Sequence, residues 1–259
     1  MTYTSYCALG DSFSEGMNDP APDGAPDRYR GWADRLAELL TTSTTGSPDL
    51  TYANLAIRGR LLDAIIAEQV PRALELKPDL VSLVGGGNDC IRPGADPDAL
   101  AAKLDDAVVR LQESGATVLL ATGFDTRMTP LLRAIRGRVG IFNANIWTIA
   151  QRRGAFVLDS WGLKPLHDLS RWSEDRLHLS AEGHEIVAQQ ALAVLEGRPT
   201  PEAGQVPVAR PARPLRQAVN EEAAWVRQHL APWVGRRIRR TSSGDGRSAK
   251  EPELRRVRM

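Results

Sequence analysis

Residues 6–16 read YCALGDSFSEG: a short apolar run stops at Gly10, and an Asp-Ser turn follows at once. A serine directly after a buried strand lies at the strand's carboxyl end, where parallel α/β sheets bind their ligands. Gly10 and Gly16 permit a tight backbone around Ser12 and Ser14. A serine in such a turn more often serves turn chemistry or a helix cap, so the segment alone indicates only a candidate nucleophile.

Further strand-like segments alternate along the chain with longer stretches of helical periodicity. The strand-like segments begin at Leu50, Asp79, Thr117 and Ala155, and the helical stretches cover residues 29–40, 61–76, 97–113, 138–153 and 181–195. This alternation predicts an α/β fold, a three-layer α/β/α sandwich around a parallel sheet of about five strands.

Charge divides the 259-residue chain into two parts. Hydrophobic residues make up 42% and charged residues 25%, which is ordinary for a globular protein and excludes a wholly disordered one. From Arg198 onward there are 14 Lys and Arg against 6 Asp and Glu, a net charge of +8, so residues before it carry −7. An acidic body argues against a nucleic acid as substrate.

The same division predicts the domain organisation. We expect the α/β domain in residues 1–197, a Pro-rich linker in 198–214, an amphipathic basic helix in 215–240 and a disordered basic tail in 241–259. The basic segment suggests peripheral contact with an anionic membrane or an acidic partner. Packing over the acidic body and simple solvation are the alternatives.

Cysteine usage and the N-terminal sequence bear on location. Cys7 and Cys90 have no metal-like spacing and are expected to be buried thiols, with neither a disulfide framework nor a metal site. Strand-like residues begin at Tyr3, which leaves no room for a signal peptide, and no apolar run approaches the ~18 residues of a membrane span. A cytoplasmic location is therefore expected.

A second chemical constellation lies in WSEDRLHLSAEGHEIVA, residues 172–188. Asp175 and His178 stand three residues apart in a loop before a helix, for which Ser180 is a candidate N-cap. This spacing lets the carboxylate approach Nδ1 of the imidazole and leaves Nε2 free to accept a serine proton. The alternative for an isolated pair is a surface aspartate and a packing histidine.

Glycine-rich turns after the second and third strands offer donors for an oxyanion. GGGND, residues 85–89, places Asn88 where its side-chain amide can point into the cleft, and ANLAIRGR, residues 53–60, places the Gly59 N–H at a strand end. The alternative is that these glycines serve only as turns.

Four blocks in this order resemble the SGNH hydrolases, also called the GDSL esterase/lipase family. They are GDSF at residues 10–13, NLAIRG ending at Gly59, GGND at 86–89 and DRLH at 175–178, within a similarity that spans roughly the first two hundred residues. The resemblance implies a flavodoxin-like strand order. It assigns the site residues as follows: Ser12 as nucleophile and backbone oxyanion donor, Gly59 and Asn88 as further oxyanion donors, Asp175 and His178 as the rest of the triad, and Asp11 and Asp89 as loop braces. Phe13 stands where the family motif has leucine.

The expected activity is carboxylic ester hydrolysis by a serine esterase or lipase that forms an acyl-enzyme, without a metal or cofactor. Small soluble esters, acetyl esters, thioesters and lysophospholipid-like substrates all stay open. One alternative is acyl transfer to a sugar or metabolite alcohol with the same triad. Another is a catalytically silent binding protein, against which the intact triad argues.

Other residues compete for these roles less well. Ser14 is expected to point away, His184 to be a packing or surface residue, and His167 to lie in a loop that could border the pocket. The segment GFDTRMTPLLRAIRGR, residues 123–138, is either part of the substrate wall or a solvated connection.

Overall fold

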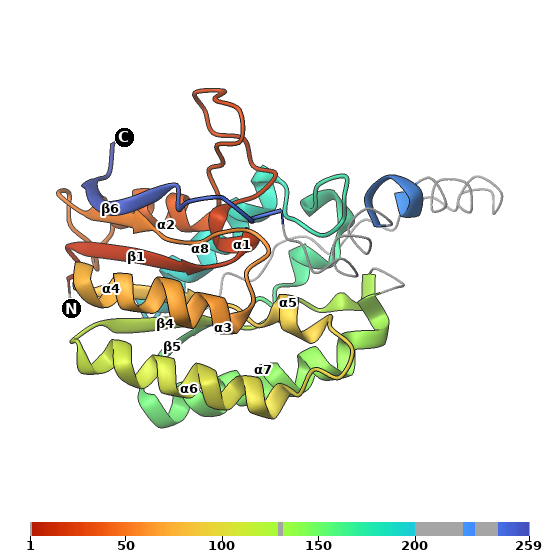
Figure 1. Cartoon of the computed structure of the whole chain (residues 1–259). Helices are drawn as coiled ribbons and strands as arrows, with labels where there is room; N and C mark the ends of the chain where they lie inside the picture. Colours follow the sequence, from red (N-terminus) through yellow and green to blue (C-terminus); the bar gives the residue numbers. More distant parts are fainter. Residues whose placement is uncertain (1, 129–131, 200–224, 231–242, 259) are drawn as a thin grey trace.

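One mixed sheet organises the chain. The computed structural model describes residues 2–128, 132–199, 225–230 and 243–258, and within them six strands lie in the order β5-β4-β3-β1-β2-β6 (Figure 1). The strands are β1 Ser5–Gly10, β2 Thr51–Asn54, β3 Leu80–Val84, β4 Thr117–Ala121, β5 Phe156–Leu158 and β6 Glu251–Arg256. β1 to β5 pair in parallel, in the expected flavodoxin-like order, and β6 adds an antiparallel edge beside β2.

Helices cover both faces of this sheet. α2 (Trp32–Leu40) and α8 (Ala181–Leu195) pack on one face, and α4 (Val70–Leu76), α6 (Pro97–Glu113) and α7 (Arg136–Arg153) on the other (Figure 1). The short helices are α1 Ser12–Glu15, α3 Leu62–Ala64 and α5 Gly87–Cys90. Single 3₁₀ turns occupy Thr126–Met128, Leu132–Ile135, Lys164–His167 and Leu169–Arg171. The three-layer sandwich is thus confirmed.

β1 is buried on both faces, as the central strand of a covered parallel sheet must be. Tyr6 and Ala8 pack with the α2 and α8 side, and Cys7 and Leu9 pack with the α6 and α7 side. The near-continuous apolar run that ends at Gly10 follows from this double burial.

The expected helical stretches match the structure closely where local signals are strong. α6 and α8 have the expected bounds, and Ser180 caps α8 by accepting a hydrogen bond from the Gly183 N–H at 3.3 Å. The stretch at 61–76 is less regular: α3 passes through a π-helical turn, Ile65–Gln69, into α4. Gln69 is buried there and pairs with both backbone groups of Gly10, at 2.7 and 2.9 Å, which fixes the end of β1.

The expectation of a disordered tail in residues 241–259 is wrong for the residues the structure describes there. β6 pairs with β2 through Thr51–Arg256, Tyr52–Arg255 and Asn54–Glu251. A strand at a sheet edge is held by backbone hydrogen bonds and tolerates charged side chains and proline, so EPELRR has a disorder-like composition and still forms a strand. The sheet therefore has six strands where about five were expected.

Most of the region between the α/β body and β6 lies outside the described residues. Of the predicted linker, 198–214, only residues 198 and 199 are described. Of the predicted basic helix, 215–240, only residues 225–230 are described. There a π-helical turn spans Val226–Leu230, Trp225 is buried, and the Arg176 guanidinium lies 4.9 Å from the centre of its ring. Across the described part of the chain, no helix is both long enough and apolar enough to cross a bilayer.

Candidate active site

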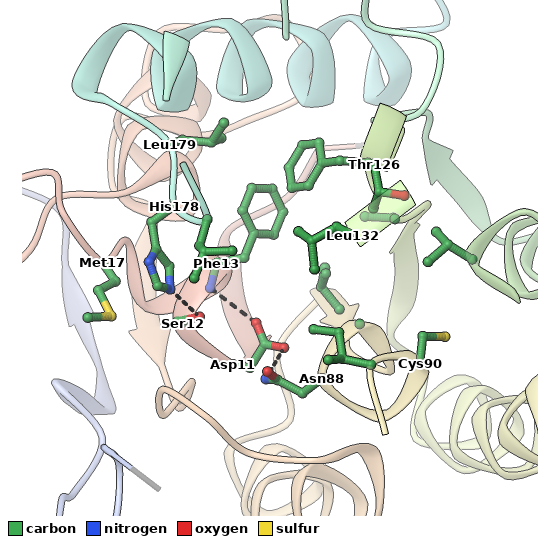
Figure 2. A pocket seen from close by; sticks show the side chains of 18 of the residues that line it. Asp11, Ser12, Phe13, Met17, Asn88, Cys90, Thr126, Leu132, His178 and Leu179 are labelled. Atoms are coloured by element: carbon green, nitrogen blue, oxygen red, sulfur yellow. Dashed lines mark hydrogen bonds between the residues drawn. The ribbon is translucent and has the colours of Figure 1, made fainter. Parts of the chain in front are cut away.

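The carboxyl ends of β1, β2 and β3 bring the predicted site residues together. Ser12, Gly59 and Asn88 follow these three strands, and His178 enters from the loop before α8. All four line one cavity, and Figure 2 shows Ser12, Asp11 and Asn88 grouped opposite the His178 ring.

Ser12, His178 and Asp175 form a continuous hydrogen-bonded chain. The Ser12 Oγ lies 3.0 Å from His178 Nε2, and His178 Nδ1 lies 2.6 Å from Asp175 Oδ2. The left-handed backbone of Arg176, with φ 54°, turns the chain between Asp175 and His178 so that the two side chains meet. The hydroxyl therefore faces a nitrogen whose ring is oriented from its other side by a carboxylate.

The surroundings of Asp175 keep its carboxylate charged. Burial by itself raises the pKa of Asp175, but hydrogen bonds from the His178 ring and from the backbone N–H groups of Leu177 and His178 hold it well below the ordinary range. Ser173 Oγ donates to Oδ1 at 2.7 Å and Asn18 Nδ2 donates to Oδ2 at 2.9 Å. Asp175 is thus ionised at neutral pH and fixed in orientation.

Asp11 fixes the start of α1, the helix that begins at Ser12 and is called the serine helix below. As the N-cap of α1 it accepts a hydrogen bond from the Phe13 N–H at 3.1 Å through Oδ1, and Oδ2 accepts one from Asn88 Nδ2 at 2.9 Å. Asn88 Nδ2 also donates to the Arg60 carbonyl at 3.0 Å. Asp11 therefore connects the loop after β1 to the loop after β3.

Asp89 links α5 to α3 in a similar way. Its Oδ2 accepts a hydrogen bond from the Leu62 N–H at 3.0 Å, and burial raises its pKa. Gly59, between β2 and α3, has φ 73°, a conformation that glycine adopts without strain. These contacts fix the positions of the loops that carry Gly59 and Asn88 relative to Ser12.

An apolar cavity of about 250 Å³ opens beside Ser12. Aromatic rings form one wall: Phe13 meets Phe124 edge to face at 5.0 Å between centroids, and Phe124 meets Trp172 at 5.1 Å. Figure 2 shows Leu132 projecting into the cavity and Cys90 at its far side from His178. The cavity thus has the reactive groups and Asn88 at one end, and apolar side chains make up most of the rest of its lining.

The segment at 123–138 provides part of this wall, so the structure favours the first of its two sequence interpretations. Thr126, Leu132 and Ile135 line the cavity. Asp125 also lines the cavity, and hydrogen bonds from Arg136 outweigh the effect of burial and lower the pKa of its carboxyl. Two arginines, Arg127 and Arg136, pair with it.

Comparison with known proteins places the chain in a family. Residues 8–186 match the model of the GDSL-like Lipase/Acylhydrolase family. The chain belongs to this family. As a member of this family it is an esterase. No curated protein shows significant sequence similarity to it.

Solved structures share the fold of this GDSL-like hydrolase at low identity. A variant of Axe2, an acetyl xylan esterase from Geobacillus stearothermophilus, matches with a TM-score of 0.62 at 20% identity over 76% of this chain and 97% of that chain. The psychrotrophic esterase EstA from Pseudoalteromonas sp. gives 0.59 at 16%, over 75% and 97%. TesA gives 0.60 at 20%, over 74% and 98%.

Of the competing residues of this GDSL-like hydrolase, Ser14 and His167 lie outside the described lining of the cavity, and His184 lines it as a neutral ring. Ser14 is fully buried and its hydroxyl packs against Gly10, where an added Cβ would come within 2.7 Å. His184 is buried, its Nδ1 accepts from the Trp32 N–H at 3.1 Å, and desolvation lowers its pKa to about 3, so it stays neutral. His167 is absent from the described lining of the cavity.

Both cysteines are free and buried, as expected. Cys90 borders the cavity, and burial together with the nearby Asp89 raises its pKa to about 11, so it is a neutral thiol at pH 7. Among the described residues no group of three or more His, Cys, Asp or Glu side chains is placed to hold a metal ion.

Sequence analysis missed the groups that hold the serine helix from outside. Glu15, the last residue of α1, forms a buried ion pair with Arg58, whose backbone N–H also donates to Glu15 Oε2 at 2.6 Å. Arg58 immediately precedes Gly59. A signal was present in the ordered blocks, since Arg58 lies within NLAIRG and Glu15 follows GDSF by two residues, but nothing in the sequence pairs them across 43 positions.

Proposed function

We propose that this esterase cleaves carboxylic esters with an apolar acyl group, with Ser12 as nucleophile, His178 as general base and Asp175 as the group that orients the histidine. The observation that carries the proposal is the chain of contacts from Ser12 Oγ to His178 Nε2, 3.0 Å, and from His178 Nδ1 to Asp175, 2.6 Å. Two Axe2 variants described as catalytic mutants, one with serine and one with histidine replaced by alanine, lend further support.

The reaction proceeds through an acyl-enzyme. His178 Nε2 takes the Ser12 proton as Oγ attacks the ester carbonyl, and the tetrahedral intermediate collapses when the imidazolium returns that proton to the departing alcohol oxygen. Water then attacks the acyl-serine, His178 takes its proton, and the carboxylic acid leaves as Ser12 regains its hydrogen. Asp175 stays ionised throughout and stabilises the imidazolium.

Three donors serve the oxyanion in this proposal: the N–H of Ser12, the N–H of Gly59 and the side-chain amide of Asn88. The amide donates to Asp11 and to the Arg60 carbonyl in the substrate-free protein, so one of these contacts must be shared with or replaced by the oxyanion. Loss of one such donor slows turnover on the order of 10²- to 10³-fold. Asn88→Ala is therefore expected to be severe and milder than Ser12→Ala.

The apolar cavity supports the choice of acyl group. A cavity of about 250 Å³ with a mostly apolar lining has room for an acyl chain of medium length. Each methylene that leaves water contributes about 0.8 kcal/mol, which is about a fourfold gain in kcat/KM. The gain should stop when the cavity is full.

Hydrolysis rates on p-nitrophenyl esters from acetate to palmitate test this assignment. We expect kcat/KM to rise to an optimum near hexanoate or octanoate and then fall, and Ser12→Ala to abolish turnover of every ester. Leu132→Trp should move the optimum to shorter chains, whereas Ala134→Trp, which introduces the same side chain at an exposed position of the same turn, should not.

Two outcomes would overturn the proposal. Full activity of Ser12→Ala would remove the nucleophile assignment. If kcat/KM depends on the alcohol in a series of acetate esters and does not depend on the length of the acyl chain, the proposed acyl specificity is wrong. Product analysis with added alcohols distinguishes hydrolysis from acyl transfer, because only transfer yields a new ester.

A further inference from the structure

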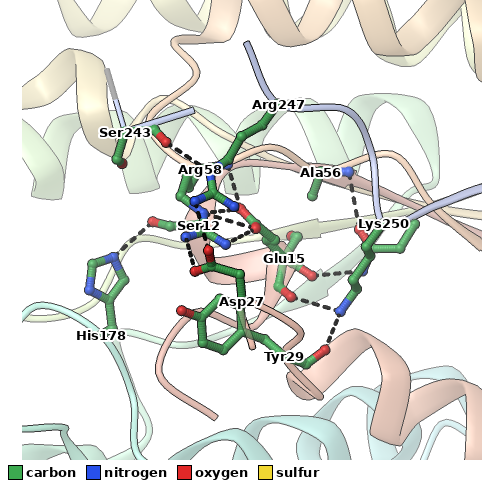
Figure 3. A network of polar contacts seen from close by, with 12 residues as sticks. Ser12, Glu15, Asp27, Tyr29, Ala56, Arg58, His178, Ser243, Arg247 and Lys250 are labelled. Carbon is green, nitrogen blue, oxygen red and sulfur yellow. Dashed lines mark hydrogen bonds and ion pairs between the residues drawn. The ribbon is translucent and has the colours of Figure 1, made fainter. Parts of the chain in front are cut away.

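The C-terminal segment of residues 243–258 reaches the serine helix through one ammonium group. Lys250 Nζ donates to the Glu15 carbonyl at 2.7 Å and to the Tyr29 carbonyl at 3.0 Å (Figure 3). It also donates to Asp34 Oδ2 at 2.6 Å. These contacts use all three of its hydrogens. The side chain is only 16% exposed, so this charge is held inside the protein.

The first of these contacts falls on the element that carries Ser12. α1 is four residues long, from Ser12 to Glu15, and a helix of that length has too few internal hydrogen bonds to be stable alone. The carbonyls of its last turn need partners from elsewhere. Lys250 supplies one to Glu15 and at the same time binds the Tyr29 loop and the start of α2, so α1 is fixed against two neighbours.

The same segment also packs against the loop that carries Gly59. Gly244 is buried against the Arg58 backbone, and a Cβ added there would lie 2.1 Å from the Arg58 carbonyl oxygen. Arg58 in turn pairs with Glu15 and lies over the Tyr29 ring at 4.9 Å. Ser243, at the start of the segment, borders the cavity.

The charges of the C-terminal segment are opposite to those of the surface it contacts. Arg247 Nη2 lies 3.2 Å from Asp27, and Lys250 pairs with Asp34, so basic residues of the tail meet acidic residues of the body. The model of the family ends at residue 186, so Lys250 lies beyond the part of the chain that the family match covers.

We propose that Lys250 is a positioning residue for the esterase reaction: it fixes α1 through the Glu15 carbonyl and thereby keeps the Ser12 hydroxyl directed at His178. The inference rests on the proposed role of Ser12. It makes the C-terminal segment part of the active-site framework. A displacement of about 1 Å at a reacting atom can cost about 10²-fold in rate, so loss of the anchor should act on turnover.

Lys250→Met and Lys103→Met test the proposal as a matched pair in the full-length chain. Lys103 binds Asp63 at 2.7 Å on the outer surface of α6 and has no contact with the site. We expect Lys250→Met to lower kcat about 10- to 100-fold on p-nitrophenyl hexanoate with KM within about twofold, because the apolar cavity is untouched. Its rate of inactivation by a fluorophosphonate should fall in parallel, and Lys103→Met should match wild type.

A second variant guards against a folding defect. Lys250→Gln keeps two N–H donors for the carbonyls, so its kcat should lie between those of wild type and Lys250→Met. Circular dichroism and a thermal unfolding midpoint well above the assay temperature establish that each variant is folded. If both folded variants have wild-type kcat, or if only the unfolding midpoint moves, the positioning role is wrong.

The two proposals fail separately. Activity retained in Ser12→Ala would contradict the proposed function. Activity lost in Ser12→Ala and retained in Lys250→Met and Lys250→Gln would contradict only the positioning role.

Discussion

The two halves of the proposed triad are supported in opposite ways. The Asp175–His178 loop is held mainly by its own neighbours, since Asp175 accepts hydrogen bonds from Ser173, Leu177 and His178. The helix of Ser12 is held from far along the chain, by Arg58 through Glu15 and by Lys250 through the Glu15 carbonyl.

This difference separates what a local motif encodes from what the whole fold provides. A loop in which most of the hydrogen bonds to Asp175 span two or three residues, with Asn18 as the distant donor, carries much of its geometry in its own sequence. A four-residue helix does not, so its orientation depends on groups that only the folded chain brings near. We therefore expect damage to the first region to appear in catalysis, and damage to the supports of the second to appear in stability as well.

The largest effect is expected from Asp175→Asn. The amide cannot stabilise the imidazolium and favours the wrong tautomer of His178, so kcat should fall on the order of 10³- to 10⁴-fold while the fold persists. Steady-state kinetics with p-nitrophenyl hexanoate measures it. Glu174→Gln, at the exposed neighbouring position, is the control and should stay within about twofold of wild type. A tenfold loss or less in Asp175→Asn would contradict the orienting role.

The next effect compares the supports directly. Arg58→Met leaves Glu15, 8% exposed, without its ion-pair partner, and should lower the free energy of unfolding by about 3–5 kcal/mol. Asn18→Ala removes one hydrogen bond to the charged Asp175 and should cost about 1.5–3 kcal/mol.

Urea unfolding of the two variants provides the measurement. Arg72→Met, which removes an arginine paired with Glu75 and Glu253 at the surface, is the control and should change stability little. An Asn18→Ala variant that is less stable than Arg58→Met would reverse the comparison.

The smallest effect concerns His184, which lies between the two regions. Its Nδ1 accepts from the Trp32 N–H and its ring stacks on Phe13 at 6.2 Å between centroids. Desolvation lowers its pKa to about 3, below the ordinary value of 6.5, so the unfolded chain binds one more proton between those values. Stability should therefore fall on acidification below about pH 6.5, with at most about 1.4 kcal/mol per pH unit from this group.

His184→Asn keeps an acceptor for Trp32 and removes the titration. Urea unfolding between pH 6.5 and 4.5 should give a shallower dependence on pH for the variant than for wild type. Equal slopes would show that His184 does not titrate on unfolding.

The sequence predicted those parts of the fold that have strong local signals. α6 begins at Pro97 after the Asp96 cap and α8 begins after Ser180, and both have the expected bounds. The strands β1 to β5 were recognisable because burial on both faces demands apolar runs. β6 was not, because this charged edge strand is held by its backbone partner, and that partner, β2, lies about two hundred residues away in sequence.

The candidate site divides in the same way. The seven predicted residues fell on ordered blocks of sequence, and the structure brings them to one end of the sheet. Glu15, Asn18 and Lys250 escaped prediction because each acts through a contact with a distant segment, and no periodicity or motif records such a contact.

Covalent labelling tests the central claim most directly. The folded protein is incubated with a fluorophosphonate, whose phosphorus is attacked by an activated serine with loss of fluoride, and the modified peptide is identified by mass spectrometry. We predict one adduct, on Ser12, that is lost in His178→Ala. An adduct on Ser14 or another serine, undiminished labelling in His178→Ala, or no adduct on folded wild-type protein would contradict the assignment.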